Sequence, residues 1–297
     1  MHYRPLGLSG IHVSEIAFGC MSLSSNSEEE NLSLIHRAID LGINLFDTAD
    51  LYDKGINEIV VGKALKAKRH QVILATKVGN QWRKDGSGWD WNPQKDYILQ
   101  SVEKSLGRLQ TDYIDLYQLH GGTIDDPIDG TIEAFELLKN QGKIRNYGIS
   151  SIRPNVIREY VKRSSIVSVM TQYSLLDRRP EETTLDLLQQ NNIGVLVRGA
   201  LAQGLLVDKP PKEYLGCTKE EVNSAEKAIL HLSGSGRTAA QTAIQYVLAQ
   251  PAVTSAVIGI RNMNQLNDVT SGNLPLQKEE VKSLRESVKS MVYEQHR

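Results

Sequence analysis

Cysteine, metal-binding histidine patterns and long apolar runs are scarce or absent in this sequence. Its two cysteines, Cys20 and Cys217, are too few for a disulfide framework and lack the CxxC spacing of zinc or redox sites. Its seven histidines never occur in HxH or HExxH patterns, so we expect no metal site. No segment holds the ~18 apolar residues of a membrane helix, and the start MHYRPLGLSG lacks the apolar core of a signal peptide. We therefore expect a cytoplasmic protein without a membrane partner.

An excess of one charge is also missing. The 34 Lys and Arg residues balance 35 Asp and Glu residues, so no global charge attracts nucleic acid, and we expect no nucleic-acid partner. No GxGxxG motif follows a predicted strand, which argues against a Rossmann nucleotide site. Hydrophobic residues form 40% of the chain, enough for a large core, and no linker divides it. Residues 1–297 are expected to form a single domain.

Eight short β-rich runs alternate with longer segments of helical periodicity. Amphipathic stretches such as EEENLSLIHRAIDLG and GTIEAFELLKNQG predict crossover helices, several of them ended by glycine. Apolar strands separated by helices are typical of a parallel sheet, and eight such units close into a (β/α)₈ TIM barrel of the α/β class. A doubly wound open sheet is the competing topology. The predicted strands lie near residues 16–18, 43–46, 72–75, 114–118, 147–149, 167–171, 194–197 and 255–258.

Two segments depart from this alternation. YRPLGLSGIHVS predicts two short strands around a turn, an N-terminal β-hairpin that would plug the barrel floor. The long interval between the last two strands predicts a loop over 207–219 and extra C-terminal helices near 220–232 and 238–249. That loop could serve ligand binding or be a surface insertion.

Polar side chains follow several of the predicted strands. In a parallel barrel the carboxyl ends of all strands face one mouth, so these residues should meet there. Taken singly, each has an ordinary structural explanation: Asp47 as a helix cap, Lys77 as a solvated charge, His120 as a core histidine and Tyr52 as a packing ring. The residues that end the strands are Gly19, Asp47, Lys77, His120, Ser150, Gln172, Arg198 and Gly259.

Together, several strings resemble the aldo-keto reductase family, in that family's order. They are FDTADLYDKGINEIVVGKAL, ILATKVG, DLYQLH, GKIRNYGISS and TQYSLLDRR, within a similarity that runs from GLSGIHVSEIAFGCM to GIRNMNQL. The resemblance implies an NADPH-dependent reductase of aldehydes or ketones, of the bacterial type. Its partner would be a small-molecule carbonyl substrate of undetermined identity, and the protein would be a monomer or a weak homo-oligomer.

The resemblance also implies the catalytic residues. Tyr52 would protonate the carbonyl oxygen, and His120 would orient the substrate. A phenol with a pKa near 10 is a reluctant donor at neutral pH, and an ammonium about 4 Å away contributes roughly 4 kcal/mol to the phenolate. Lys77 would supply that ammonium, and Asp47 would hold it in place.

The same resemblance implies a nucleotide site around the mouth. Ser150 and Gln172 match residues that hydrogen-bond the nicotinamide carboxamide, and Tyr173 matches a stacking position. Arg261 and Gln265 match residues at the adenosine 2′-phosphate and adenine. Arg198 stands where many relatives carry an aromatic residue, while Ile258 and Val269 replace a common proline and asparagine. The whole implied set is Gly19, Cys20, Met21, Asp47, Ser150, Ser151, Gln172, Tyr173, Arg198, Gly199, Ala200, Leu201, Gln203, Gly204, Gly259, Arg261, Gln265 and Asp268.

Two other functions stay open at this point. An NADPH-binding sensor or regulatory subunit with little turnover would use the same nucleotide site. A barrel lyase would use Lys77 as a Schiff-base nucleophile. The loop NQWRKDGSGWDWNP carries Trp82, Trp89 and Trp91, which either wall an apolar substrate pocket or pin the loop to nearby helices.

Overall fold

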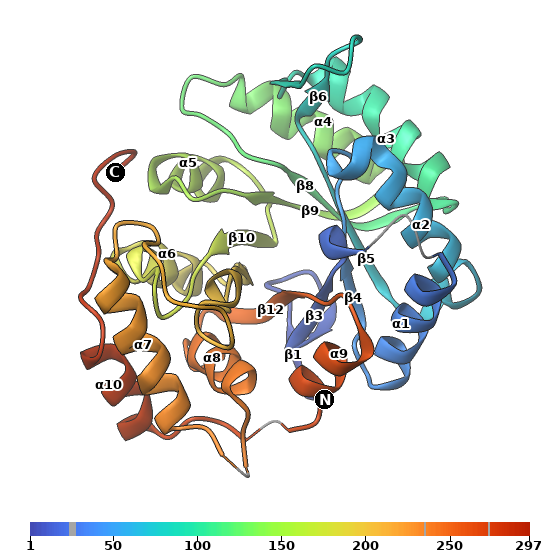
Figure 1. The fold of residues 1–297 in the computed structure, drawn as a ribbon. Coiled ribbons are helices and arrows are strands. Elements are labelled where there is room, and N and C mark those ends of the chain that lie inside the picture. Colours follow the sequence, from blue (N-terminus) through green and yellow to red (C-terminus); the bar gives the residue numbers. More distant parts are fainter. Residues whose placement is uncertain (24–27, 235, 273) are drawn as a thin grey trace.

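The computed structural model describes residues 1–23, 28–234, 236–272 and 274–297, and its centre is a closed barrel of parallel strands (Figure 1). The barrel prediction is confirmed, and the open-sheet alternative is wrong. Every predicted strand is present, most of them extended by one or more residues. Around the barrel the strands follow the order β10 (Ser168–Gln172), β11 (Gly194–Arg198), β12 (Val253–Gly259), β3 (Ile16–Gly19), β4 (Leu45–Asp47), β5 (Ile73–Val78), β8 (Ile114–Leu119) and β9 (Ile144–Ser150).

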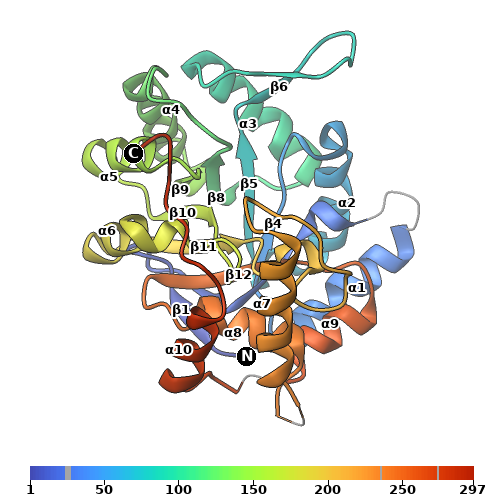
Figure 2. The same ribbon diagram turned by 60° about the vertical axis from the view of Figure 1, so that its left-hand side comes forward.

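Helices surround the barrel, so each strand is covered on its outer side (Figure 2). Those at the C-terminal end begin with strong caps: Thr218 and Glu221 form a reciprocal capping box, as do Thr238 and Gln241. The two extra helices predicted there are confirmed. The helices are α1 (Glu28–Asp40), α2 (Ile56–Leu65), α3 (Lys95–Leu109), α4 (Ile128–Asn140), α5 (Pro154–Arg163), α6 (Thr184–Gln190), α7 (Lys219–His231), α8 (Ala239–Leu248), α9 (Met263–Thr270) and α10 (Lys278–Glu286).

Alternation along the strands divides the core into two parts. One set of apolar side chains fills the space between strands and helices, and a smaller set, including Leu45, Ala75 and Leu196, fills the barrel interior. Because side chains alternate between faces along a strand, the residue two positions after each of these also faces inward. Asp47, Lys77 and Arg198 therefore point into the barrel mouth rather than toward the helices.

The N-terminal hairpin closes the opposite end of the barrel, as predicted. Strands β1 (Tyr3–Pro5) and β2 (His12–Ser14) pair antiparallel, and Leu6 and Val13 are buried against the interior side chains. Gly7 makes the turn possible: its φ is +55°, and a Cβ there would lie 2.4 Å from the carbonyl oxygen of Val167. The floor is thus sealed by backbone in close contact.

The tryptophan-rich segment after β5 differs from the loop expected there. It forms an antiparallel hairpin of β6 (Asn80–Trp82) and β7 (Trp89–Trp91), which extends from the barrel in Figure 2. The indole of Trp91 donates to both carboxylate oxygens of Asp126 at 3.0 Å, and that of Trp82 donates to the Leu51 carbonyl at 3.2 Å. The hairpin is therefore fastened at both strands. No helix within the described residues is long and apolar enough to cross a membrane.

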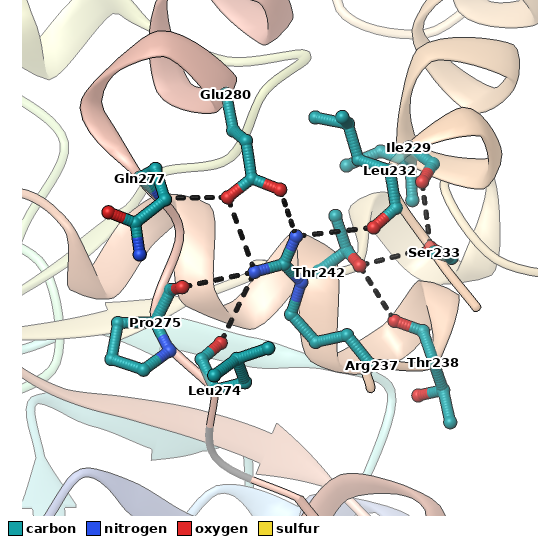
Figure 3. Close-up of polar contacts among 10 residues, drawn as sticks. All are labelled: Ile229, Leu232, Ser233, Arg237, Thr238, Thr242, Leu274, Pro275, Gln277 and Glu280. Carbon is teal, nitrogen blue, oxygen red and sulfur yellow. Dashed lines mark hydrogen bonds and ion pairs between the residues drawn. The ribbon is translucent and has the colours of Figure 1, made fainter. Parts of the chain in front are cut away.

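A buried arginine joins the C-terminal helices (Figure 3). Arg237, at the turn between α7 and α8, is 6% exposed and pairs with Glu280 of α10 at 2.6 Å. The same guanidinium donates to the carbonyls of Leu232, Leu274 and Pro275. This side chain therefore connects α7, α8 and the start of α10 without leaving its charge unpaired.

Candidate active site

The ends of the barrel strands bring the predicted catalytic side chains to one mouth. Asp47 is the last residue of β4, and His120 directly follows β8. Lys77 lies one residue before the end of β5, not beyond it as the sequence suggested. Tyr52 comes from the short 3₁₀ helix Tyr52–Gly55, in which Asp53 and Lys54 adopt positive φ angles and turn the chain sharply toward α2. Four separate segments thus converge.

Lys77 has a buried ammonium with a complete set of acceptors. Its Nζ lies 2.6 Å from Asp47 Oδ2, 2.8 Å from the Thr48 carbonyl and 3.3 Å from the Tyr52 hydroxyl oxygen. An ammonium has three N–H donors, so each has one partner. Burial alone lowers the pKa of Lys77, but the attraction of Asp47 and then Tyr52 outweighs it, and the pKa lies above its ordinary value. The lysine is therefore a fixed positive charge beside a phenol.

His120 faces Tyr52 edge-on across the mouth. Their ring centroids are 5.9 Å apart with an interplanar angle of 85°. Burial, followed by the charges of Lys77 and Arg198, lowers the pKa of His120 to about 3, so the imidazole is neutral at physiological pH. Its Nδ1 is buried and has no hydrogen-bond partner among the described residues. A neutral imidazole and a phenol thus frame the same small space.

Three supporting residues were not identified from the sequence. The Thr48 hydroxyl donates to Asn57 Oδ1 at 2.6 Å, and the Asn57 amide donates to the Cys20 carbonyl at 2.9 Å. This bridge ties the end of β3 to the peptide that accepts from the lysine. Gln118 donates to Asp47 Oδ1 at 3.2 Å. Its position two residues before His120 on an inward-facing register was a usable sequence signal.

Residues predicted to hold the nicotinamide end of a nucleotide lie on the other side of the mouth. Ser150 and Gln172 end β9 and β10 on inward-facing positions. Gln172 donates to Asp177 at 3.1 Å and accepts from Arg198 at 2.7 Å. Ser151 is buried, and its hydroxyl accepts from a backbone N–H.

Tyr173 does not reach the mouth. It is fully buried, donates to Glu181 at 2.6 Å and lies 6.0 Å from the Tyr246 ring. Because Gln172 faces inward, the next residue turns outward, so a stacking role for Tyr173 has no support in the structure. Cys20 is also fully buried, whereas Met21 is 64% exposed at the rim.

The segment after β11 turns tightly beside the mouth. Gly199 has a φ of +77° and approaches the Gln172 side chain, and positive φ angles recur at Ala202, Gln203 and Gly204. Ala200 is buried and Leu201 half-buried. Successive turns of this kind expose backbone N–H groups that can bind phosphate oxygens.

The end of β12 supplies an uncompensated charge. Arg261 is exposed directly before α9, and no carboxylate within the described segments forms an ion pair with it. Its backbone N–H donates to the Gln265 side chain at 2.9 Å, while Asp268 lies half-buried further along the helix and Gly259 lies at the rim. A helix start with a free guanidinium favours an anion such as a phosphate.

Taken together, the side chains fit a nicotinamide nucleotide laid across the mouth. His120 Nδ1 lacks a partner among the described residues, the turns after β11 present backbone donors, and Arg261 is an exposed cation without an ion pair in that part of the chain. Each is a feature that a polyphosphate with an amide-bearing ring could engage. No group of three or more potential metal ligands occurs in the part of the chain that the structure describes.

Comparisons with known proteins agree with this geometry. The model of the aldo/keto reductase family matches residues 15–289. The chain belongs to the aldo/keto reductase family. It is 50% identical to the uncharacterized oxidoreductase YqkF of Bacillus subtilis over the full length of both chains, and 33% identical to the aldo-keto reductase YhdN of the same organism over 90% of this chain and 87% of the relative.

Solved structures show the same relationship. The holo form of aldo-keto reductase AKR11C1 from Bacillus halodurans is 50% identical, with a TM-score of 0.94 over 100% of this chain and 99% of that one. The apo form of the same protein gives a TM-score of 0.85. The backbone therefore follows the holo form more closely.

Proposed function

We propose that the protein reduces an aldehyde or ketone to the alcohol with NADPH, and that Tyr52 is the proton donor. The observation that carries this proposal is the contact between Lys77 Nζ and the Tyr52 oxygen at 3.3 Å, with the other two lysine donors held by Asp47 and the Thr48 carbonyl. When bound, the nucleotide supplies a hydride to the carbonyl carbon. The side chains of this chain orient the carbonyl and protonate its oxygen.

The proton moves from Tyr52 to the carbonyl oxygen as charge develops there. Because the lysine donates to the phenol oxygen, the hydroxyl proton is free to point toward the substrate, and the phenolate left behind lies beside a positive charge. His120 is neutral, so it can donate a hydrogen bond to the same oxygen without competing as an acid. Tyr52 thus donates the proton, and His120 holds the carbonyl oxygen by a hydrogen bond.

Arg261 supports the choice of NADPH. Relatives differ in this respect: an Escherichia coli protein 34% identical to the chain over 71% of each protein is an NADH-specific methylglyoxal reductase, and a fission yeast relative carries NADP(+) in its name. A free guanidinium at the start of α9 suits the additional phosphate that distinguishes the two nucleotides.

The lyase alternative fits the site less well. A Schiff-base lysine needs an uncharged, accessible amine. Lys77 is 1% exposed, fully hydrogen-bonded and shifted to a higher pKa, the opposite of what a nucleophile requires. Treatment with borohydride and a carbonyl compound should therefore leave no adduct on this residue.

The decisive experiment measures the loss of absorbance at 340 nm when the purified protein meets NADPH and a panel of small aldehydes. Turnover that falls by about 10²-fold or more in Tyr52→Phe, with NADPH binding retained, is the expected result. A Tyr52→Phe variant that keeps more than about a tenth of wild-type kcat would contradict the assignment. Saturable NADPH binding without turnover of any aldehyde would favour a sensing protein instead.

A further inference from the structure

Arg198 is a positive charge aimed into the mouth from the wall opposite the catalytic lysine. In the closed strand order, three strands separate β11 from β5 in each direction, so the ends of these two strands face one another across the barrel. Leu196 belongs to the interior cluster, and Arg198 follows it by two residues, on the same inward-facing register. Arg198 thus lies where a ligand between the two walls must pass close to it.

Within the described part of the chain, this charge is bonded to a neutral side chain and to no acid. Its Nη1 donates to Gln172 Oε1 at 2.7 Å, and no carboxylate of the described residues forms an ion pair with it. The nearest acid in this network, Asp177, accepts two hydrogen bonds from Arg179 at 2.7 Å each. Asp177 is therefore already neutralised, and the field of Arg198 extends into the mouth.

The reacting centre experiences this field. Arg198 is one of the two cations that help to lower the pKa of His120, after burial and Lys77. A charge that disfavours a second proton on His120 also disfavours any other positive charge placed beside that ring. On the proposed function, the nicotinamide must lie there, since its hydride has to reach a carbonyl held between Tyr52 and His120.

We propose that Arg198 makes the site select the reduced nucleotide over the oxidised one. The dihydronicotinamide ring is neutral, and loss of a hydride with its two electrons to the carbonyl carbon leaves a ring that carries one positive charge. Arg198 repels this charged ring and not the neutral one. Its charge thereby favours binding of NADPH, release of NADP⁺ after turnover, and reduction over alcohol oxidation. This inference rests on the proposed function and concerns the same site.

The test compares dissociation constants for NADPH and NADP⁺, measured separately by quenching of tryptophan fluorescence at fixed ionic strength. Arg198→Met should lower the ratio of the NADP⁺ constant to the NADPH constant by about tenfold relative to the wild type. Arg198→Lys retains the charge and should keep most of the wild-type ratio. Arg163→Met is the matched control, because it removes a positive charge at the end of α5 that is paired with Asp129 of α4 and Glu159 of α5.

One outcome overturns the proposal: a ratio of the two dissociation constants that Arg198→Met does not lower. If both constants also rise by the same factor, Arg198 holds a part common to both nucleotides. Circular dichroism of each variant checks that the fold is kept. The ratio measured for Arg198→Lys separates loss of the charge from loss of the arginine side chain. If the wild-type protein binds neither nucleotide, the proposed function itself fails, whereas binding with an unaltered ratio refutes only the role of Arg198.

Discussion

Replacing Lys77 with methionine should destabilise the protein far more than replacing Lys77 and Asp47 together. The two side chains are 1% and 4% exposed, and 2.6 Å separates Nζ from Oδ2. Methionine keeps most of the side-chain volume but leaves a buried carboxylate whose remaining partner among the described residues is the Gln118 amide. Removing one member of such a pair costs about 3–5 kcal/mol, so Lys77→Met should lose that amount of unfolding free energy.

The double variant isolates the electrostatic part of this loss. Asp47→Asn keeps an oxygen acceptor for Gln118, and together with Lys77→Met it leaves no charge at the site, so at least about 2 kcal/mol should be recovered. Urea unfolding at pH 7, followed by far-UV circular dichroism, measures all four proteins. Single-variant losses that simply add in the double variant would refute the reasoning, because they would mean that the two charges do not interact.

Three further variants test other parts of the structure. Burial, and then Glu58, raises the pKa of Asp50 to about 8, so the folded state keeps a proton that the unfolded state releases above about pH 4. The unfolding free energy of the wild type, relative to that of Asp50→Asn, should therefore fall between about pH 5 and pH 8, by up to about 1.4 kcal/mol per pH unit. Urea unfolding that gives the two proteins the same pH dependence would contradict this. Arg237→Met should cost about 3 kcal/mol by urea unfolding because it strands Glu280 and several carbonyls; a loss below about 0.5 kcal/mol would show the cluster to be unimportant. Arg261→Ala should raise KM for NADPH at least about tenfold and change that for NADH little, and equal changes would exclude a phosphate contact.

The barrel could be predicted because its information is local. Each strand carries an apolar run and each connection a helical period, so the order of elements follows from the sequence, and the carboxyl ends of the strands locate the mouth. Asp47, Lys77 and His120 were found in this way. The register within each strand also carried information that was not used. It places Gln118 beside Asp47 and turns Tyr173 away from the mouth, and both follow from alternation alone.

The remaining features depend on contacts that no local pattern encodes. The bridge from Thr48 through Asn57 to the Cys20 carbonyl joins residues from three segments, and Thr and Asn are common in turns whatever their partners. The β6–β7 hairpin has strands of three residues each, too short for an alternation to be recognised. Its stability comes from Trp82 and Trp91, whose partners Leu51 and Asp126 lie elsewhere in the sequence.

The sealed floor of the barrel has a consequence for how the chemistry is supplied. The hairpin of β1 and β2 covers the floor, and an apolar cluster that includes Leu45, Ala75 and Leu196 lies between it and the mouth. In the proposed reaction, substrate, nucleotide and the proton that restores the phenol after each turnover would therefore all enter at the mouth. A bound alcohol product would then lie between solvent and the Tyr52 phenolate, so Tyr52 would be reprotonated only after the alcohol is released. The closed floor would thus link reprotonation of Tyr52 to product release.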